Sequence, residues 1–308
     1  MATGHLRIGT RGSPLALWQA RHVQARLCAA HGFAPEALEI VPIKTSGDRI
    51  QDRPLSEVGG KGLFTKELEE ALLTGSIDLA VHSMKDVATV LPERLAINCL
   101  LEREDPRDAF VSLKSKSLAE LPAGSLIGTA SLRRQAQVLR QRPDVRVTTL
   151  RGNVDTRLRK LAEGQADATL LAMAGLIRLG LQAKATAIVP VEVMLPAVAQ
   201  GAIGIETRRD DSATNRLVDL LNHVPTNLCI ATERAFLARL DGSCRTPIAG
   251  LATLDGKQLK FRGLILSLDG KTAHETERCG ELADAEQIGR EVAETLLSAA
   301  GPYFLAKV

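Results

Sequence analysis

The sequence predicts an α/β fold with two similar lobes and a smaller α+β domain near its C-terminal end. Two observations favour the lobes: short apolar runs alternate with helical patterns, and residues 125–129 (SLIGT) resemble residues 7–10 (RIGT). A third observation favours the last domain, because two Leu-Asp-Gly-Lys turns separate alternating segments after residue 250. The chain has 308 residues, more than one core usually organises, so two or three domains are expected.

The first lobe begins with a strand at residues 6–10, followed by a helix with Ser13 as its N-cap and Pro14 in its first turn. The apolar stripe of this helix consists of Ala16, Ala20, Val23 and Leu27. The elements expected next are a strand at 38–43, a polar and mobile loop at 45–62, a helix that ends near Gly75 and a strand at 77–81. Lys85 and Asp86 therefore follow the end of a strand.

The second lobe repeats this order. Its expected elements are a strand at 125–129, a helix capped by Ser131, a strand at 145–150, a helix over 157–164, a strand at 168–173 and a short helix with Arg178. In the last domain, Ile288, Val292 and Leu296 give a final helix one apolar face, which covers an antiparallel sheet. The predicted domains are residues 1–102 with a return at 202–221, residues 103–201, and residues 222–308, which contain Cys244.

Composition disfavours several classes of protein. Lys and Arg number 39 against 36 Asp and Glu, the charges are interleaved, and there are only six Phe, one Trp and one Tyr, so a nucleic-acid partner is not expected. The first residues lack a signal-peptide pattern, and no apolar run of about 20 residues occurs, so neither export nor membrane insertion is expected. Five cysteines without C-x-x-C and six scattered histidines indicate a cytoplasmic protein without a structural metal.

Basic side chains recur directly after the predicted strands: Arg11, Lys85, Arg133, Arg134 and Arg151. In open α/β sheets, ligands bind outside the carboxyl ends of the strands. Guanidinium groups match carboxylates through paired hydrogen bonds, so the sequence predicts a cleft between the lobes that holds a small molecule with several carboxylates. Phosphate is the weaker alternative, because neither a P-loop nor a strand-linked G-x-G-x-x-G is present.

Two other classes of function remain open on the residues alone. The lobes suit a binding protein that closes on a dicarboxylate, and Cys244 suits an acyltransferase with a cysteine nucleophile, although no histidine motif accompanies it. Each residue also has a plainer interpretation. A single arginine is usually solvated, Lys85 and Asp86 would ordinarily form a weak surface pair, and a lone cysteine is usually a small buried hydrophobe. His82 is expected to be structural.

Seven motifs distributed along the chain occur together in one known family. They are residues 7–19 (RIGTRGSPLALWQ), 58–64 (VGGKGLF), 81–87 (VHSMKDV), 103–110 (REDPRDAF), 128–135 (GTASLRRQ), 150–158 (LRGNVDTRL) and 241–247 (DGSCRTP). Through them the chain resembles the porphobilinogen deaminase family over nearly its whole length. Ala88 and Ala199 depart from the family pattern, because many relatives have Pro and Gly at these positions.

The resemblance implies two lobes like type-II periplasmic binding proteins and a third domain whose Cys244 carries a dipyrromethane cofactor through a thioether. It also implies a monomeric transferase that joins four porphobilinogen molecules head to tail, releases ammonia each time and frees hydroxymethylbilane. Asp86 matches the catalytic carboxylate. The resemblance assigns Ser83, Lys85, Ser131, Arg133 and Arg134 to the cofactor, Arg11, Ser13, Arg151, Arg157 and Arg178 to the substrate, Lys61 and Phe64 to a lid, and Gln200 to a hinge.

These implied roles agree with the chemistry of the reaction. Loss of ammonia leaves an azafulvenium cation, which a fixed carboxylate at Asp86 would stabilise while it accepts a hydrogen bond from the pyrrole N–H and helps to relay protons. Each pyrrole carries an acetate and a propionate, which accounts for the number of arginines.

Overall fold

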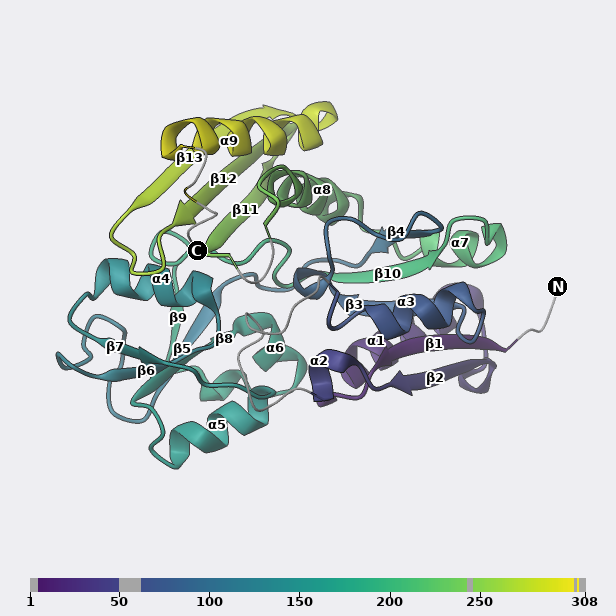
Figure 1. Cartoon of the computed structure of the whole chain (residues 1–308). Coiled ribbons are helices and arrows are strands. Elements are labelled where there is room, and N and C mark those ends of the chain that lie inside the picture. Colours follow the sequence, from purple (N-terminus) through teal and green to yellow (C-terminus); the bar gives the residue numbers. More distant parts are fainter. Residues whose placement is uncertain (1–4, 50–61, 243–245, 302–303, 305–308) are drawn as a thin grey trace. The chain divides into compact units, whose positions relative to one another are not determined.

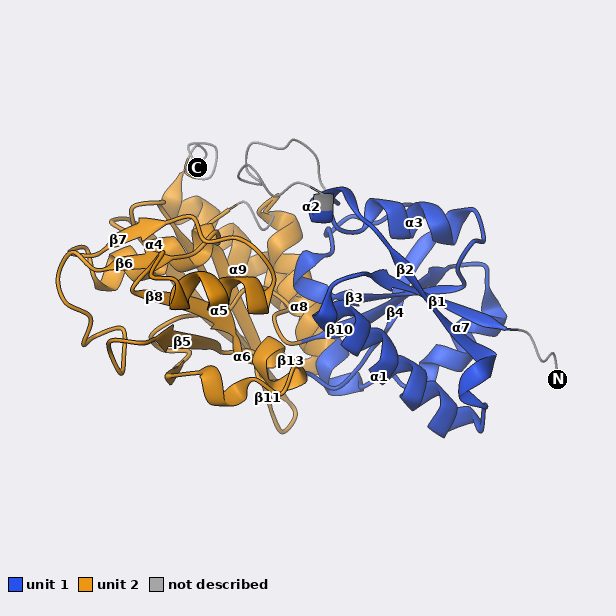
Figure 2. Cartoon of the chain, turned by 90° about the horizontal axis from the view of Figure 1, so that it is seen from below, with its two compact units in different colours: residues 1–53, 59–104, 202–227 blue, residues 54–58, 105–201, 228–308 orange. Residues whose placement is uncertain are grey.

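The computed structural model describes residues 5–49, 62–242, 246–301 and 304 (Figure 1). Lys61 and Cys244, for which the sequence predicts a lid and a cofactor attachment, lie outside these residues. The chain divides into two compact units (Figure 2), which are residues 1–53, 59–104 and 202–227, and residues 54–58, 105–201 and 228–308. We call them unit 1 and unit 2.

Unit 1 is built on a five-stranded sheet of order β2-β1-β3-β10-β4. Its strands are β1 (Leu6–Arg11), β2 (Leu38–Ile43), β3 (Leu79–Ser83), β4 (Leu95–Leu100) and β10 (Ile203–Arg208). β1 runs parallel to β2 and β3, whereas β10 is antiparallel to both β3 and β4. Because β1 and β3 are parallel neighbours, the residues that follow them lie along one edge of the sheet.

Helices cover this sheet with apolar side chains. α1 (Pro14–His31) buries Ala20, Val23 and Leu27 in one core cluster, to which α7 (Ser212–Asp219) also contributes. α3 (Lys66–Leu73) buries Leu68 and Leu72 in a separate cluster with residues of β3 and β4. The predicted Ser13 cap and apolar stripe of α1 are therefore confirmed.

Two local predictions for unit 1 need correction. Ser46–Arg49 forms a short helix, α2, inside the segment predicted as a loop, because Asp48 accepts hydrogen bonds from the Thr45 N–H and hydroxyl and so organises the turn. The strand expected at 77–81 is β3, which begins two residues later; Ile77 is buried but precedes the strand. β4 and α7 were not predicted.

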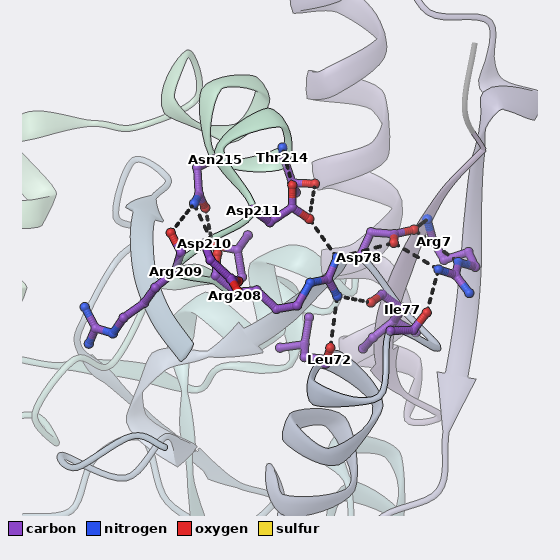
Figure 3. A network of polar contacts seen from close by, with 12 residues as sticks. Arg7, Leu72, Ile77, Asp78, Arg208, Arg209, Asp210, Asp211, Thr214 and Asn215 are labelled. Atoms are coloured by element: carbon purple, nitrogen blue, oxygen red, sulfur yellow. Dashed lines mark hydrogen bonds and ion pairs between the residues drawn. The ribbon is translucent and has the colours of Figure 1, made fainter. Parts of the chain in front are cut away.

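A polar network closes the other edge of the unit 1 sheet (Figure 3). Arg208 donates from Nη1 to the carbonyl oxygens of Leu72 and Ile77, at 2.9 Å each, and from Nη2 to Asp211 at 2.7 Å. Asp78 accepts hydrogen bonds from the backbone and the guanidinium of Arg7. The network joins the end of β10 to the starts of β1 and β3, so it is structural and lies away from the carboxyl ends of those strands.

Unit 2 contains a second five-stranded sheet, of order β7-β6-β8-β5-β9. The strands are β5 (Asp108–Ser112), β6 (Leu126–Gly128), β7 (Arg146–Thr148), β8 (Ala168–Ala172) and β9 (Ala187–Val189). β6 is parallel to β7 and β8, and β5 is antiparallel to β8 and β9, as in the first sheet. The helices α4 (Leu132–Gln141), α5 (Val154–Ala162) and α6 (Met173–Arg178) follow β6, β7 and β8. The predicted α/β class and the repeat of its strand pattern are confirmed.

The C-terminal part of unit 2 contains the predicted antiparallel sheet and helix. The sheet order is β11-β12-β13, with β11 (Ile248–Asp255), β12 (Gln258–Leu266) and β13 (Ala273–Glu281). α9 (Ala285–Ala300) buries Ile288, Val292 and Leu296, as its period predicted, and α8 (Val224–Arg239) precedes the sheet. The division into three domains remains a prediction. Among the residues that the structure describes, no helix combines the length and apolar character needed to span a bilayer.

The two Leu-Asp-Gly-Lys turns have different surroundings, and this difference leads to a prediction about stability. Gly256 and Gly270 have φ of 58° and 71°, so an added side chain is strained at either position. A Cβ at Gly256 would meet open space, whereas one at Gly270 would lie 2.4 Å from the Ala136 oxygen and 2.5 Å from the Arg140 nitrogen of α4.

We therefore expect Gly270→Ala to lower the free energy of unfolding by about 1–3 kcal/mol more than Gly256→Ala, since only the first forces backbone apart. Denaturant unfolding of both variants, with the wild type as reference, measures the difference. Equal losses would contradict the close packing of the second turn on α4.

Candidate functional site

The carboxyl edge of the unit 1 sheet carries several of the predicted site residues. Arg11 ends β1, Ser13 caps α1, and Ser83 ends β3. Lys85 and Asp86 follow in the 3₁₀ turn Met84–Asp86. Nη1 of Arg11 lies 3.7 Å from Oδ2 of Asp86, whose side chain is 31% exposed. The structure thus places a half-buried carboxylate beside a guanidinium at the end of two parallel strands.

Arg11 also binds a second carboxylate, that of Asp48. Its Nη2 is 2.5 Å from Asp48 Oδ1 and its Nε is 3.3 Å from Oδ2. The ring of Phe64 lies against the same guanidinium, with Cζ 4.1 Å from the ring centroid. Burial alone would raise the pKa of Asp48, but the hydrogen bond and charge of Arg11, with the Thr45 hydrogen bonds, bring it below its usual value. Sequence reasoning did not identify Asp48.

Gln19 and Glu206 are two further buried residues of unit 1 that sequence reasoning missed. The Gln19 amide exchanges hydrogen bonds with the Ser83 hydroxyl at 2.8 and 3.1 Å, and only 1% of Gln19 is exposed. Nε2 of His82 lies 2.9 Å from Oε2 of Glu206, so His82 is buried in a polar pair, as its expected structural role requires. The sequence did contain a signal for Gln19, because it is a polar residue directly before Ala20 on the apolar face of α1.

Unit 2 holds a second group of predicted residues around one buried carboxylate. Asp108, at the start of β5, is fully buried and pairs with Arg134 at 2.7 Å and with Arg133 at 2.8 Å. Both arginines lie in the first turn of α4, behind the N-cap Ser131, and are about as buried as the core, with 4% and 5% exposed. Burial would raise the pKa of Asp108, but the charges of the two guanidinium groups lower it well below its usual range.

The remaining hydrogen bonds of these two arginines are unequal. Arg134 also donates to the Leu170 carbonyl at 2.7 Å, and Arg133 to the Leu195 carbonyl at 2.8 Å. Within the described residues, the buried Nε of Arg133 has no hydrogen-bond partner. The three ionised groups together carry a net charge of +1, so this cluster is suited to an additional anion.

Gln200 completes the contacts to Asp108. Its amide nitrogen donates to Asp108 Oδ1 at 2.9 Å and to the Pro106 carbonyl at 2.7 Å. The preceding Ala199, which stands where many relatives have Gly, has φ of 60°, in the left-handed region that Gly adopts most readily. Its N–H donates to the buried Glu233 at 2.6 Å, which holds this backbone in place. The predicted hinge at Gln200 remains a prediction.

The other predicted arginines of unit 2 follow its strands and helices as expected. Arg178, at the end of α6, is buried and donates to the Gly201 carbonyl at 2.6 Å. Arg157, in α5, donates from Nε to the Gly152 carbonyl at 2.8 Å, and Arg151 is half-buried after β7. In unit 1, Ala88 is half-buried two residues after Asp86.

The described residues provide neither a cluster of metal ligands nor a disulfide. In the described part of the chain, no three His, Cys, Asp or Glu side chains are grouped so that they could hold a metal ion. The described cysteines, Cys28, Cys99, Cys229 and Cys279, form no disulfide with one another. Burial raises the pKa of Cys99 to about 12, so it is inert at neutral pH.

The fold and these side chains define an α/β protein with several arginines gathered near the ends of its strands. Comparison with known proteins then gives the family. Residues 6–216 match the family model "Porphobilinogen deaminase, dipyromethane cofactor binding domain", and residues 227–298 match "Porphobilinogen deaminase, C-terminal domain". The chain therefore belongs to the porphobilinogen deaminase family, so the family, the transferase class, the tetrapyrrole pathway and the cofactor predicted from the sequence are confirmed.

Individual relatives agree with this assignment. The chain is 59% identical over 297 residues to the porphobilinogen deaminase of Nitrobacter hamburgensis, covering 96% of this chain and 94% of that protein. It is 58% identical to that of Nitrobacter winogradskyi, with the same coverage. Among solved structures, a periplasmic substrate-binding protein of an ABC transporter from Coxiella burnetii covers 74% of this chain and 96% of its own at 16% identity, with a TM-score of 0.44.

Removal of the Asp108 charge should destabilise the protein strongly. Asp108→Asn would leave Arg133 and Arg134 buried without a compensating charge, so we expect the free energy of unfolding to fall by about 3–5 kcal/mol. Because the pKa of Asp108 is lowered on folding, its ionisation stabilises the wild type fully above the unfolded pKa of about 4. This stabilisation is lost progressively as the pH falls from there toward the much lower folded pKa.

Unfolding free energies between pH 7 and 3 test this expectation. The difference between the wild type and Asp108→Asn should shrink as the pH is lowered. The control is Asp144→Asn, which removes a surface carboxylate paired with Arg142 and should change stability little. A loss as small as that of the control would refute the role of Asp108.

Proposed function

We propose that this protein condenses four porphobilinogen molecules head to tail, with release of ammonia, on a dipyrromethane primer attached to Cys244, and that Asp86 is its catalytic carboxylate. The observation that carries the assignment of Asp86 is its position: a partly exposed carboxylate at the carboxyl end of β3, 3.7 Å from Arg11. It follows Ser83 and Lys85 in the same short segment.

Asp86 supplies the negative charge that the reaction needs. Positive charge develops on the substrate when ammonia leaves, and a fixed carboxylate stabilises it without reorganising solvent. The distance of 3.7 Å to Arg11 is longer than a hydrogen bond, so the Asp86 oxygen near Arg11 is not held by that guanidinium and is able to accept a pyrrole N–H. The same oxygen is placed to help move a proton to or from the reacting groups.

The arginines of unit 2 fit the carboxylates of a dipyrromethane. Their cluster has a net positive charge and a buried Nε donor on Arg133 with no hydrogen-bond partner among the described residues. When bound, the dipyrromethane supplies a tethered pyrrole end from which the product chain grows. We assign Ser131, Arg133 and Arg134 to it, with Ser83 and Lys85 from unit 1, because each pyrrole brings an acetate and a propionate.

Substrate carboxylates are assigned to a second set of side chains: Arg11, Ser13, Arg151, Arg157 and Arg178. Phe64, which lies on the Arg11 guanidinium, and Lys61 are assigned to a lid that keeps water from the cation. Gln200 is assigned to a hinge. The protein is proposed to act as a cytoplasmic monomer, with neither nucleic acid nor membrane as a partner, in keeping with its interleaved charges.

Replacement of Asp86 tests its catalytic role. Asp86→Asn keeps the size and hydrogen-bonding shape of the side chain but removes its charge, so turnover should fall by at least about 100-fold. The variant is supplied as cofactor-loaded protein, and intact mass spectrometry should show the same cofactor content as the wild type. Near-normal turnover in the loaded variant would rule out Asp86 as the catalytic carboxylate.

Replacement of Cys244 tests the cofactor assignment. Cys244→Ser should show no covalent adduct, whereas the wild type should carry the mass of two condensed porphobilinogen units. Because a bound anion offsets the positive charge of the Arg133, Arg134 and Asp108 cluster, the adduct-free protein should melt at a lower temperature. A wild type without the adduct would contradict the assignment of Cys244. Equal melting temperatures of the two proteins would contradict the stabilising effect of the cofactor.

A further inference from the structure

We propose that Asp48 is a positioning residue for this reaction: it holds Arg11 at a fixed distance from Asp86 and so prevents the guanidinium from closing on the catalytic carboxylate. This inference rests on the proposed role of Asp86. It adds a residue of α2, the short helix that follows the end of β2, to the side chains on which turnover depends.

The first support is the geometry of Arg11. Asp48 binds the Nε and Nη2 edge of the guanidinium, at 3.3 and 2.5 Å, which is the edge that carboxylates grip through two parallel hydrogen bonds. Only Nη1 faces Asp86, and it remains at 3.7 Å. Phe64 lies over one face of the group. The two-pronged edge of Arg11 is therefore turned to Asp48 and not to Asp86.

The second support is that Asp48 is itself fixed. Its carboxylate accepts hydrogen bonds from the Thr45 hydroxyl at 2.8 Å and from the Thr45 backbone N–H at 3.4 Å. The adjacent Gly47 lies so close to Phe64 that an added Cβ would come within 2.3 Å of the ring. One short turn thus sets the positions of both groups that confine Arg11. The lowered pKa of Asp48 keeps it charged at neutral pH.

The third support is that Asp48 and Asp86 compete for the guanidinium of Arg11. Asp48 and Asp86 are similarly exposed, at 23% and 31% of their side chains, so solvent screens their attraction to Arg11 to a similar degree. Without the charge of Asp48, Arg11 would turn its two-pronged edge toward Asp86. A bidentate ion pair there would occupy both oxygens and neutralise the charge that the substrate cation requires.

Other charges near Asp86 do not replace Asp48 in this role. Lys85 precedes Asp86 in the same turn and has the same sign as Arg11. His82, on β3, is paired with Glu206 of β10 and buried. Among these described groups, Asp48 is the carboxylate that shares a cation with Asp86.

The experiment compares cofactor-loaded Asp48→Asn with the wild type, with porphobilinogen as substrate. We expect kcat to fall on the order of 10- to 100-fold, because Arg11 is misplaced relative to Asp86. Cofactor content, read from the intact mass, should not change. Asp48→Glu, which keeps the charge, should restore most of the turnover, and the surface control Asp144→Asn should behave as the wild type.

A double-mutant cycle decides whether Asp48 acts through Arg11. In an Arg11→Gln background, Asp48→Asn should cause little further loss, because the group that it positions is already gone. Losses that multiply, or the absence of rescue by Asp48→Glu, would mean that Asp48 only stabilises its turn and would overturn the inference. Loaded Asp86→Asn is measured in parallel: if it turns over normally, the proposed function of Asp86 has failed, whatever Asp48 does.

Discussion

The burial of two guanidinium groups around one carboxylate is the constraint on which the organisation of unit 2 depends. A charge removed from water is tolerated only when it is paired and hydrogen-bonded, so Asp108, Arg133 and Arg134 must be held together. Their pairing joins the start of β5 to the first turn of α4, and Gln200 adds the segment that leads to β10. Two guanidinium groups and one carboxylate leave the cluster with a net positive charge, which is the basis of its proposed role in binding the carboxylates of the cofactor.

The charged cluster of unit 1 has the opposite ratio of guanidinium groups to carboxylates. Arg11 is a single guanidinium shared by two carboxylates, and all three side chains are partly exposed. The arrangement leaves Asp86 near a cation without a close ion pair, as a carboxylate must be if it is to stabilise positive charge on a substrate. The Arg208 and Asp78 network, at the other edge of the same sheet (Figure 3), satisfies its polar groups with backbone carbonyls and neighbouring acids, and it serves the fold alone.

The C-terminal sheet contributes to the arginine cluster through packing. The turn at Gly270 lies against the backbone of α4, the helix whose first turn contains Arg133 and Arg134. The other Leu-Asp-Gly-Lys turn, at Gly256, meets open space. Two turns with the same sequence therefore differ in what they do, because only one of them is packed against a helix.

Much of the fold was predictable because it follows from local pattern. The Ser13 and Ser131 caps, the apolar stripes of α1 and α9 and the glycine turns depend on neighbours in the sequence, and motifs over most of the chain indicated the family and its candidate Asp86 and Cys244. β5 was missed because all five of its residues are buried, which removes the alternation that marks a half-exposed strand.

The partners of the charged residues could not be predicted from the sequence. Arg11 pairs with Asp48, 37 positions away, and Arg133 and Arg134 share Asp108, which lies on β5. By itself the sequence determined which residues carry charge and which elements they begin or end. Only the tertiary structure decided which charges meet, because electrostatic pairing depends on distance and burial, and only the folded chain establishes these.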